Sequence, residues 1–134
     1  MSGAEPIWIE EVDALALHER LLAFHGGASG LRDDGLLKSA LARARQMFAD
    51  EERADLIDMA SAYTSGVVKN HPFIDGAKRT GFVVGILFLE LNGFRFTAPE
   101  AAAAEAVLAL AAGSLEEAGY TAFLRENVTR EAKY

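Results

Sequence analysis

The sequence predicts an all-α fold: a compact helical domain around a central buried helix, with at most a small two-stranded β patch. Three observations favour this class. Apolar residues recur at helical spacing along most of the 134 residues. The segment "GFVVGILFLEL" is apolar nearly all round, as an enclosed helix is. Strand-like alternation is confined to two short stretches. The length fits a single domain over residues 1–134.

The N-terminal half predicts two helices joined by a glycine-rich turn. After a brief extended segment, "PIWIE", the first helix is expected from Glu10 to about Phe24, and the glycines of "HGGASG" end it. The second helix is expected from Asp34 to about Phe48, with Asp33 or Asp34 as its cap. Trp8 is expected to pack in the core or against a strand, and His18 and His25 are expected to be surface residues without a metal.

Two further helices are predicted in the centre of the chain. The helix over residues 52–69 has a wide apolar face, and the helix over residues 79–91 is the candidate for the central buried one. The next segment, "NGFRFT", predicts a turn and a short strand that pairs with "IWIE".

The C-terminal part predicts an alanine-rich helix that stops at Gly113, and then a last helix. Capping boxes are expected at their starts, from Thr97 to Glu100 and from Ser114 to Glu117. Pro99 suits the first turn of the alanine-rich helix.

Composition excludes several classes of function. The formal charge of -7 disfavours binding to nucleic acid through a broad basic face. The chain contains no cysteine, so disulfides and thiolate metal sites are excluded, and a reducing cytoplasm is the expected compartment. The first residues lack the basic and apolar regions of a signal peptide, and the longest apolar run is too short for a membrane span.

Residues 70–82, "NHPFIDGAKRTGF", concentrate polar chemistry at the start of a buried helix. The first amides of a helix have no intrahelical partner, and this end of the helix dipole is positive. Gly76 lets the backbone approach an anion closely, and Lys78 and Arg79 add positive charge. These features predict a phosphate-sized anion site.

The same segment carries groups suited to catalysis. A histidine ordinarily titrates near neutral pH, so His71 suits removal of a proton from a hydroxyl. Asp75 offers a hard oxygen ligand for magnesium, and Pro72 and Phe73 are expected to hold the loop on the core. Taken singly, such residues also fit a solvated loop. In combination they favour phosphoryl or nucleotidyl transfer.

The segment "HPFIDGAKRTG" resembles the signature of the Fic/Doc superfamily, which reads His-x-Phe-x-Asp-(Gly or Ala)-Asn-Lys-Arg in the Doc (death-on-curing) branch. "LALHERLLAFHGGASGLRDDGLLKSAL" is similar to the N-terminal part of that branch, and "GILFLELNGFRFTAPE" to its central helix and following strand. The resemblance extends from about residue 7 to residue 125 and implies a Fic/Doc-like helical domain.

The resemblance implies a toxin of a bacterial toxin–antitoxin module. Doc-branch proteins are ATP-dependent kinases that phosphorylate a threonine of elongation factor Tu and thereby block translation. An antitoxin, whose C-terminal segment folds into a groove, is the implied partner. Exposed apolar positions on the first and third helices are the expected location of that groove.

Site roles follow from the same resemblance. His71 would be the catalytic base, with Asp75, Lys78 and Arg79 completing the catalytic set. Asp75 would hold Mg²⁺ or orient ATP. Arg32 is a further candidate to reach the site from its loop. The implied nucleotide- and phosphate-binding positions are Gly76, Ala77, Lys78, Arg79 and Thr80.

Two features separate the alternatives within the family. Members that transfer AMP read Gly-Asn-Gly-Arg with a second arginine three residues on, whereas this chain has Lys78 and Phe82 at those positions, which favours the kinase. Ala77 stands where both branches have asparagine. Because alanine has no side-chain amide, the resemblance leaves open a weakened or inactive kinase, and a non-catalytic binding module.

Overall fold

The computed structural model of the chain describes residues 5–50 and 54–131. In that part of the chain there are six helices and two short strands, which confirms the prediction of a helical domain with a small two-stranded patch. The elements are α1 (Glu11–His25), α2 (Asp34–Asp50), α3 (Leu56–Asn70), α4 (Ala77–Leu91), β1 (Phe94–Phe96), α5 (Glu100–Ala112), α6 (Glu117–Glu126) and β2 (Val128–Arg130).

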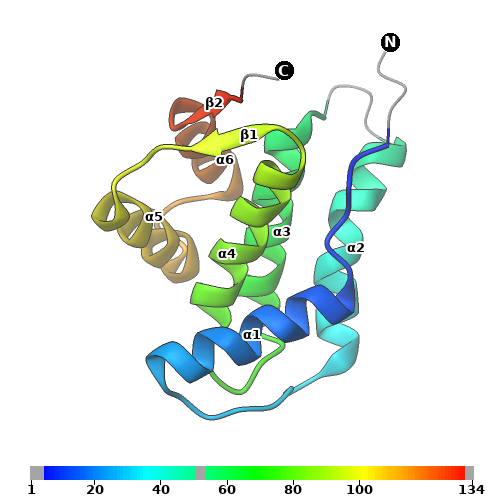
Figure 1. Cartoon of the computed structure of the whole chain (residues 1–134), viewed down its shortest axis with the longest axis vertical. Helices are drawn as coiled ribbons and strands as arrows, with labels where there is room; N and C mark the ends of the chain where they lie inside the picture. Colours follow the sequence, from blue (N-terminus) through cyan, green and yellow to red (C-terminus); the bar gives the residue numbers. More distant parts are fainter. Residues whose placement is uncertain (1–4, 51–53, 132–134) are drawn as a thin grey trace.

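The core is organised around the neighbouring helices α3 and α4. In Figure 1, α2 lies beside this pair, α5 and α6 lie on its other side, and α1 crosses its lower end. The predicted central helix is α4, and α3 beside it is buried even more completely, from Ile57 to Val68 with only Asp58 half-buried. The apolar side chains of α3 are therefore not exposed, and the expectation that α3 offers a partner groove was wrong.

Small residues bring these central helices close together. A methyl group added at Gly81 of α4 would lie 3.2 Å from the Thr64 carbonyl oxygen of α3, and one at Gly85 would lie 2.9 Å from that of Ala60. The Thr64 hydroxyl donates a hydrogen bond of 2.8 Å to the Gly81 carbonyl. The close packing of α4 on α3 fixes where the N-terminus of α4 lies, and therefore the position of the loop before it.

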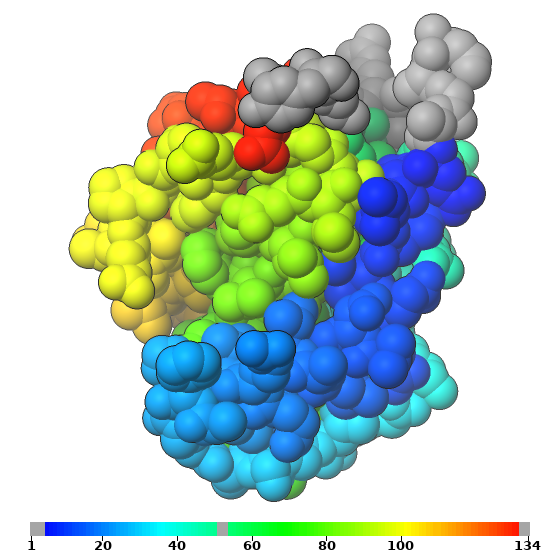
Figure 2. Space-filling view, viewed as in Figure 1, coloured from blue at the N-terminus to red at the C-terminus, as the bar shows by residue number. Residues whose placement is uncertain are grey.

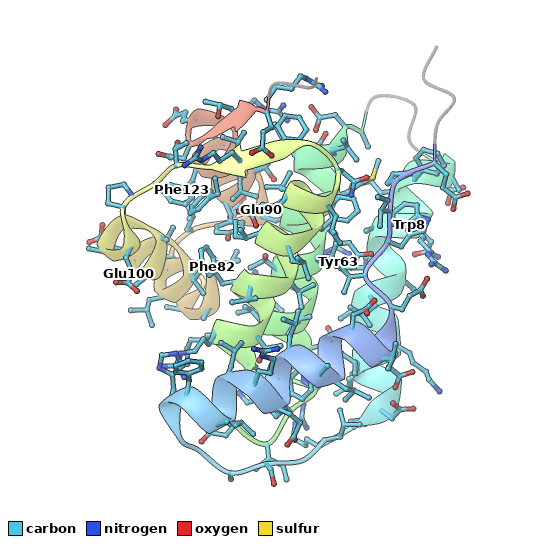
Figure 3. The ribbon with its side chains drawn as sticks, viewed as in Figure 1. Trp8, Tyr63, Phe82, Glu90, Glu100 and Phe123 are labelled. Atoms are coloured by element: carbon cyan, nitrogen blue, oxygen red, sulfur yellow. The ribbon has the colours of Figure 1, made fainter. Side chains whose placement is uncertain are left out.

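The β patch forms between different segments from those predicted. β1 pairs antiparallel with β2, and Arg95 lies opposite Thr129. The pairing of "NGFRFT" with "IWIE" was therefore wrong. The N-terminal segment is held by side chains instead, because the Asn92 amide exchanges two hydrogen bonds with the backbone of Ile7, and the Ile9 amide donates to the Tyr63 hydroxyl. Figure 3 shows Tyr63 in the interior and Trp8 beside α2.

Trp8 is half-buried and packs against the core, one of the two roles predicted for it. Its ring lies 5.6 Å from that of Phe48 and 5.9 Å from that of Phe88, measured between ring centroids. These contacts join the N-terminal segment to α2 and α4.

The starts of α2, α3 and α4 differ in how well the sequence predicted them. Asp33 caps α2 through a 3.0 Å hydrogen bond from the Leu36 amide, as one of the two predicted caps. α3 begins after its cap Asp55, later than residue 52, although residues 52 and 53 lie outside the described part. α4 begins at Ala77, two residues before the predicted start at 79.

Neither predicted capping box of the C-terminal part forms. The cap residues are Pro99 for α5 and Glu116 for α6, without a side-chain hydrogen bond. The Thr97 hydroxyl donates to the Asn127 carbonyl and the Ser114 hydroxyl to the Ala109 carbonyl. Both hydroxyls are therefore bound to carbonyl groups and do not cap the helix that follows them. Gly113 ends α5 as predicted. Within the described residues, every helix is too short or too polar to cross a membrane.

Candidate functional site

A cavity of about 760 Å³ lies where α1, α4 and α5 meet. In Figure 2 the blue surface of α1 lies below the yellow-green surface of α4 and the yellow surface of α5. Six of the predicted site residues line this cavity together, whereas Thr80 is fully buried and does not line it. The six are His71, Asp75, Gly76, Ala77, Lys78 and Arg79.

The loop between α3 and α4 is held by the segment that precedes α2. The amides of Arg32 and Asp33 both donate to the Pro72 carbonyl, at 2.7 and 3.1 Å, and the Ile74 amide donates to the Gly30 carbonyl at 3.1 Å. Phe73 is completely buried beneath the loop, so Pro72 and Phe73 hold it on the core as predicted.

The Arg32 side chain binds backbone carbonyls at the edge of the site. Its side chain donates hydrogen bonds of 2.7 Å to the His71 carbonyl and 2.9 Å to the Asn70 carbonyl. These carbonyls end α3, where the helix dipole is negative and favours a cation. Arg32 therefore binds the backbone behind His71 and does not line the cavity.

His71 has an unusual backbone conformation and a hydrogen bond on its ring. With φ 53° and ψ 56° it is the one non-glycine residue in the left-handed region among the described residues. Its Nδ1 lies 3.2 Å from the Phe73 carbonyl oxygen. A carbonyl only accepts, so Nδ1 carries the hydrogen, and in the neutral ring Nε2 then has a free lone pair. This tautomer is the one that a general base requires.

The N-terminus of α4 forms the other half of the site. Gly76 is the cap residue, with φ 83°, and it contributes no side chain to the first turn. In the described part of the chain, the backbone amides of Ala77, Lys78 and Arg79 have no hydrogen-bond acceptor. Because the Lys78 and Arg79 side chains are exposed beside these free amides, the helix start has the charge and donors of an anion site.

Asp75 lies at the edge of this helix start. One carboxylate oxygen accepts from the Gly76 amide at 2.9 Å and the other from the Ala28 amide at 3.3 Å. The side chain is exposed, so its oxygens keep lone pairs that face solvent. Within the described residues no cluster of three or more acidic or histidine side chains encloses a metal position. Asp75 is thus an isolated carboxylate beside the anion site.

The sequence analysis missed a buried histidine. His18 was predicted at the surface, but it is 1% exposed, and its Nε2 lies 2.7 Å from the Asp75 carbonyl oxygen. The prediction was wrong because it considered the polar character of the residue and not its position. His18 follows Ala14 by four residues, so both lie on the buried face of α1. His25 is exposed, as predicted, and lines the cavity.

The sequence analysis also missed the apolar half of the cavity. Phe82 and Val83 of α4 face Val107 and Leu108 of α5 across it, and Figure 3 shows Phe82 between these two helices. The all-round apolar pattern of α4 was the available signal, because one of its faces lines a cavity and does not enter the core. The cavity therefore combines a cationic end with an apolar end.

Fold and site together define a helical protein with a histidine beside an uncapped, cationic helix N-terminus. Residues 8–89 match the family model described as Fic/DOC family, and the chain belongs to this family. It is 33% identical over 95 residues to "Protein kinase doc" of Escherichia phage P1, an alignment that covers 70% of this chain and 75% of that protein. The resemblance found in the sequence is thereby confirmed.

A second relative supports the same placement. "Toxin Doc" of Mycolicibacterium smegmatis (strain ATCC 700084 / mc(2)155) is 35% identical over 74 residues. That alignment covers 54% of this chain and 57% of the relative.

Proposed function

We propose that this chain is the toxin of a bacterial toxin–antitoxin module, and that it is an Mg-ATP-dependent kinase acting on a threonine or serine hydroxyl of elongation factor Tu. The observation that carries the proposal is that one cavity wall combines His71 with the uncapped start of α4 and the cations Lys78 and Arg79. Similarity to proteins named as a protein kinase and as a toxin supports it.

The nucleotide phosphates would bind at the start of α4. The three free amides from Ala77 to Arg79 and the two neighbouring cations offer donors and charge on one side of the cavity. The glycine at position 76 leaves this approach open, because it adds no side chain between the backbone and the phosphate.

His71 would act as the general base. Its Nε2, free in the tautomer that the Phe73 carbonyl selects, takes the proton of the substrate hydroxyl. The hydroxyl oxygen forms a bond to the γ-phosphorus of ATP while the bond from that phosphorus to the β–γ bridging oxygen breaks, and ADP leaves. Arg32 keeps the His71 backbone in place during this step through its two carbonyl contacts.

The residues present fit a magnesium ion shared with the substrate. Mg²⁺ typically binds one or two carboxylates together with phosphate oxygens, and Asp75 is an exposed carboxylate beside the phosphate position. When bound, the ion would neutralise charge on the phosphates. Asp75 would hold it, with Lys78 on the same cavity wall.

Ala77 is expected to weaken this activity. It is the first residue of α4, lines the cavity, and is only 3% exposed. An asparagine side chain here would place an amide among the phosphate-binding groups. Loss of one such charge-assisted contact costs about 1.5–3 kcal/mol, or roughly tenfold to more than a hundredfold in rate.

Transfer of label from γ-labelled ATP to elongation factor Tu tests the proposal. The chain as given is compared with Ala77→Asn, and Ala77→Asn with His71→Ala is the control for the base. We expect label transfer that rises at least about tenfold with asparagine and is lost in the control. If both forms are folded and neither transfers label, the kinase assignment for this target is wrong.

Two other functions are alternatives to the kinase. Ala77 favours a binding module that holds an anionic ligand without turnover, and this form would bind ATP but leave every acceptor unlabelled. AMP transfer is disfavoured by Lys78 and by Phe82, whose ring lies in the apolar half of the cavity. Protein labelled from α-labelled ATP would establish AMP transfer instead.

The proposed antitoxin would meet the exposed apolar residues of α1. Val12 is 69% and Phe24 is 83% exposed. Co-purification of the chain with a small protein encoded beside it tests the toxin–antitoxin assignment. Substitution of both residues by serine should weaken that complex, and an unchanged complex would place the partner elsewhere.

A further inference from the structure

His18 lies beneath the loop of the proposed site but outside the motif that defines it. The side chain is fully enclosed, and it does not line the cavity. Its ring is parallel to that of Phe73, with 3.9 Å between the centroids and 10° between the planes. It also lies 3.6 Å from the position that a Cβ of residue 76 would take. One side chain of α1 therefore contacts two residues of the loop, Phe73 and Asp75, and lies beside the side-chain position of a third, Gly76.

The hydrogen bond of His18 fixes the direction of one peptide group. The Asp75 carbonyl oxygen lies 2.7 Å from Nε2 and only accepts, so Nε2–H is the donor. In a trans peptide the carbonyl and the next N–H point in opposite directions. Because the carbonyl points at His18, the Gly76 N–H points away from it, toward the Asp75 side chain that accepts it at 2.9 Å.

The backbone conformation at Gly76 does not by itself fix the orientation of this peptide group. Gly76 has φ 83°, and a glycine adopts both positive and negative φ with little steric cost. If the peptide between Asp75 and Gly76 turned over, its carbonyl oxygen would face the side where the free amides of α4 begin. A partial negative charge would then stand where the phosphates of the proposed nucleotide bind.

We propose that His18 is a positioning residue, which holds the peptide between Asp75 and Gly76 so that its carbonyl points away from the bound anion, while its N–H donates to the Asp75 carboxylate beside the anion site. The identity of that anion as a nucleotide phosphate rests on the proposed function. The effect on anion binding does not depend on phosphoryl transfer. His18 acts through the backbone and does not touch substrate.

Two substitutions separate the hydrogen bond of His18 from its packing. His18→Phe keeps an aromatic ring on Phe73 but removes the donor, and His18→Gln returns an N–H donor near the position of Nε2. Tyr63→Phe is the matched control, since it removes a buried hydrogen bond to the Ile9 backbone, away from the cavity. All variants are made in the full chain, and their thermal unfolding is recorded first.

Calorimetric titration with inorganic tripolyphosphate measures the effect without requiring catalysis. We expect His18→Phe to bind about five- to tenfold more weakly, the equivalent of one hydrogen bond, and His18→Gln to remain within about threefold of the parent chain. Tyr63→Phe should lower the melting temperature and leave the affinity unchanged. Unchanged affinity in folded His18→Phe would overturn the inference, as would an equal loss of affinity in Tyr63→Phe.

The amide resonance of Gly76 gives a readout that general destabilisation does not move. In ¹⁵N-labelled protein without ligand, it should shift in His18→Phe and return toward the parent position in His18→Gln. An unmoved resonance contradicts the inference. If His18→Phe does not fold, His18→Gln decides: parent-like affinity supports the donor role, and a large loss in the folded variant refutes it.

Failure of this inference and failure of the proposed function have different signatures. If the kinase assignment is wrong, no form, including Ala77→Asn, transfers the γ-phosphate to elongation factor Tu, but His18→Phe still weakens tripolyphosphate binding. If His18 has no positioning role, Ala77→Asn transfers phosphate and His18→Phe binds the anion normally.

Discussion

The N-termini of α3 and α4 both have backbone amides without an intrahelical acceptor, but only α3 has a side chain that caps them. The cap residue of α3 is Asp55, whose carboxylate accepts the Asp58 amide at 2.9 Å, while the Asp58 carboxylate accepts the Asp55 amide at the same distance. Arg125 then binds the Asp55 carboxylate at 2.7 Å. The cap residue of α4 is Gly76, which has no side chain to cap the helix, and the amides of the first three helical residues have no acceptor in the described part of the chain.

The difference shows which helix start contributes to stability and which one is available for a ligand. At α3 the protein supplies the negative charge that a helix N-terminus favours. At α4 the protein supplies the cations Lys78 and Arg79 instead, so in the proposed function the negative charge is that of a bound anion. The free amides are tolerated because the helix start faces a cavity open to solvent, so an unfilled site costs little.

The largest expected effect comes from giving α4 its own negative charge. Ala77→Asp places a carboxylate among the free amides and should weaken ATP binding by about a hundredfold or more, because the charge repels the phosphates. The helix dipole should keep the free energy of unfolding equal or raise it by about 0.3–1 kcal/mol. Calorimetry and thermal melting measure the two quantities.

Ala77→Asn is the matched control for this substitution, since it has the same shape without the charge. It should bind ATP at least as tightly as the parent chain. Equal ATP affinity in the aspartate and asparagine variants would show that the start of α4 is not the phosphate site.

Removing one cation from α4 should have the next largest effect. Arg79→Ala loses a charged donor that lines the cavity, which we expect to weaken ATP binding by about ten- to a hundredfold. Lys69→Ala removes the same charge from an exposed residue of α3 that does not line the cavity, and should change the affinity by less than about twofold. Similar losses in both would point to net charge, and not to the site.

At α3 a substitution should change stability and leave binding intact. Asp55→Ala removes the cap, and we expect the free energy of unfolding to fall by about 1 kcal/mol. Asp55→Asn keeps a capping oxygen and loses only the ion pair with Arg125, so it should cost less, about 0.2–1 kcal/mol for such an exposed pair. Urea denaturation measures both. A change in ATP affinity would contradict the separation of the two helix starts.

The smallest effect is a pH dependence at the α3 cap. Burial acts to raise the pKa of Asp55, but hydrogen bonds from Arg125 and the Asp58 amide outweigh it, and the pKa is lowered from its ordinary 3.8. The stability that this carboxylate contributes is therefore present above about pH 4, and is lost as pH falls through the lowered value. Burial raises the pKa of Asp58, which opposes this loss.

The stability advantage of the parent chain over Asp55→Asn should accordingly shrink between pH 5 and pH 3 by about a few tenths of a kcal/mol. Urea denaturation across this range is the measurement. An advantage that grows as the pH falls would have the wrong sign for a lowered pKa.

The sequence predicted that the residues of the loop before α4 lie together, because that information is local. A histidine, an aspartate and two cations ahead of an apolar helix are contiguous, and the fold brings His71 and Arg79 to one cavity as a result. The buried position of His18 was not predicted, because it depends on contact with Asp75, 57 residues later in the chain. Only its spacing from Ala14 signalled burial.

The errors in the fold have the same origin. The alternating pattern of β1 predicted a strand, but this local pattern contains no information about the pairing partner. Residues 128–130, which follow α6, pair with β1, and the N-terminal segment is bound by the Asn92 side chain instead. The capping box predicted from Thr97 does not form, because the Thr97 hydroxyl donates instead to the carbonyl of Asn127, 30 residues away. Local spacing shows which bonds a residue is able to make, and tertiary contacts select among them.

An NMR titration with ATP tests the central claim most directly, because it observes both helix starts in one experiment. The account predicts saturable shifts of the amides of Ala77, Lys78 and Arg79, while those of Ile57 and Asp58 stay unmoved. Absence of shifts at α4, or equal shifts at both helix starts, would contradict the assignment of the α4 N-terminus as the anion site.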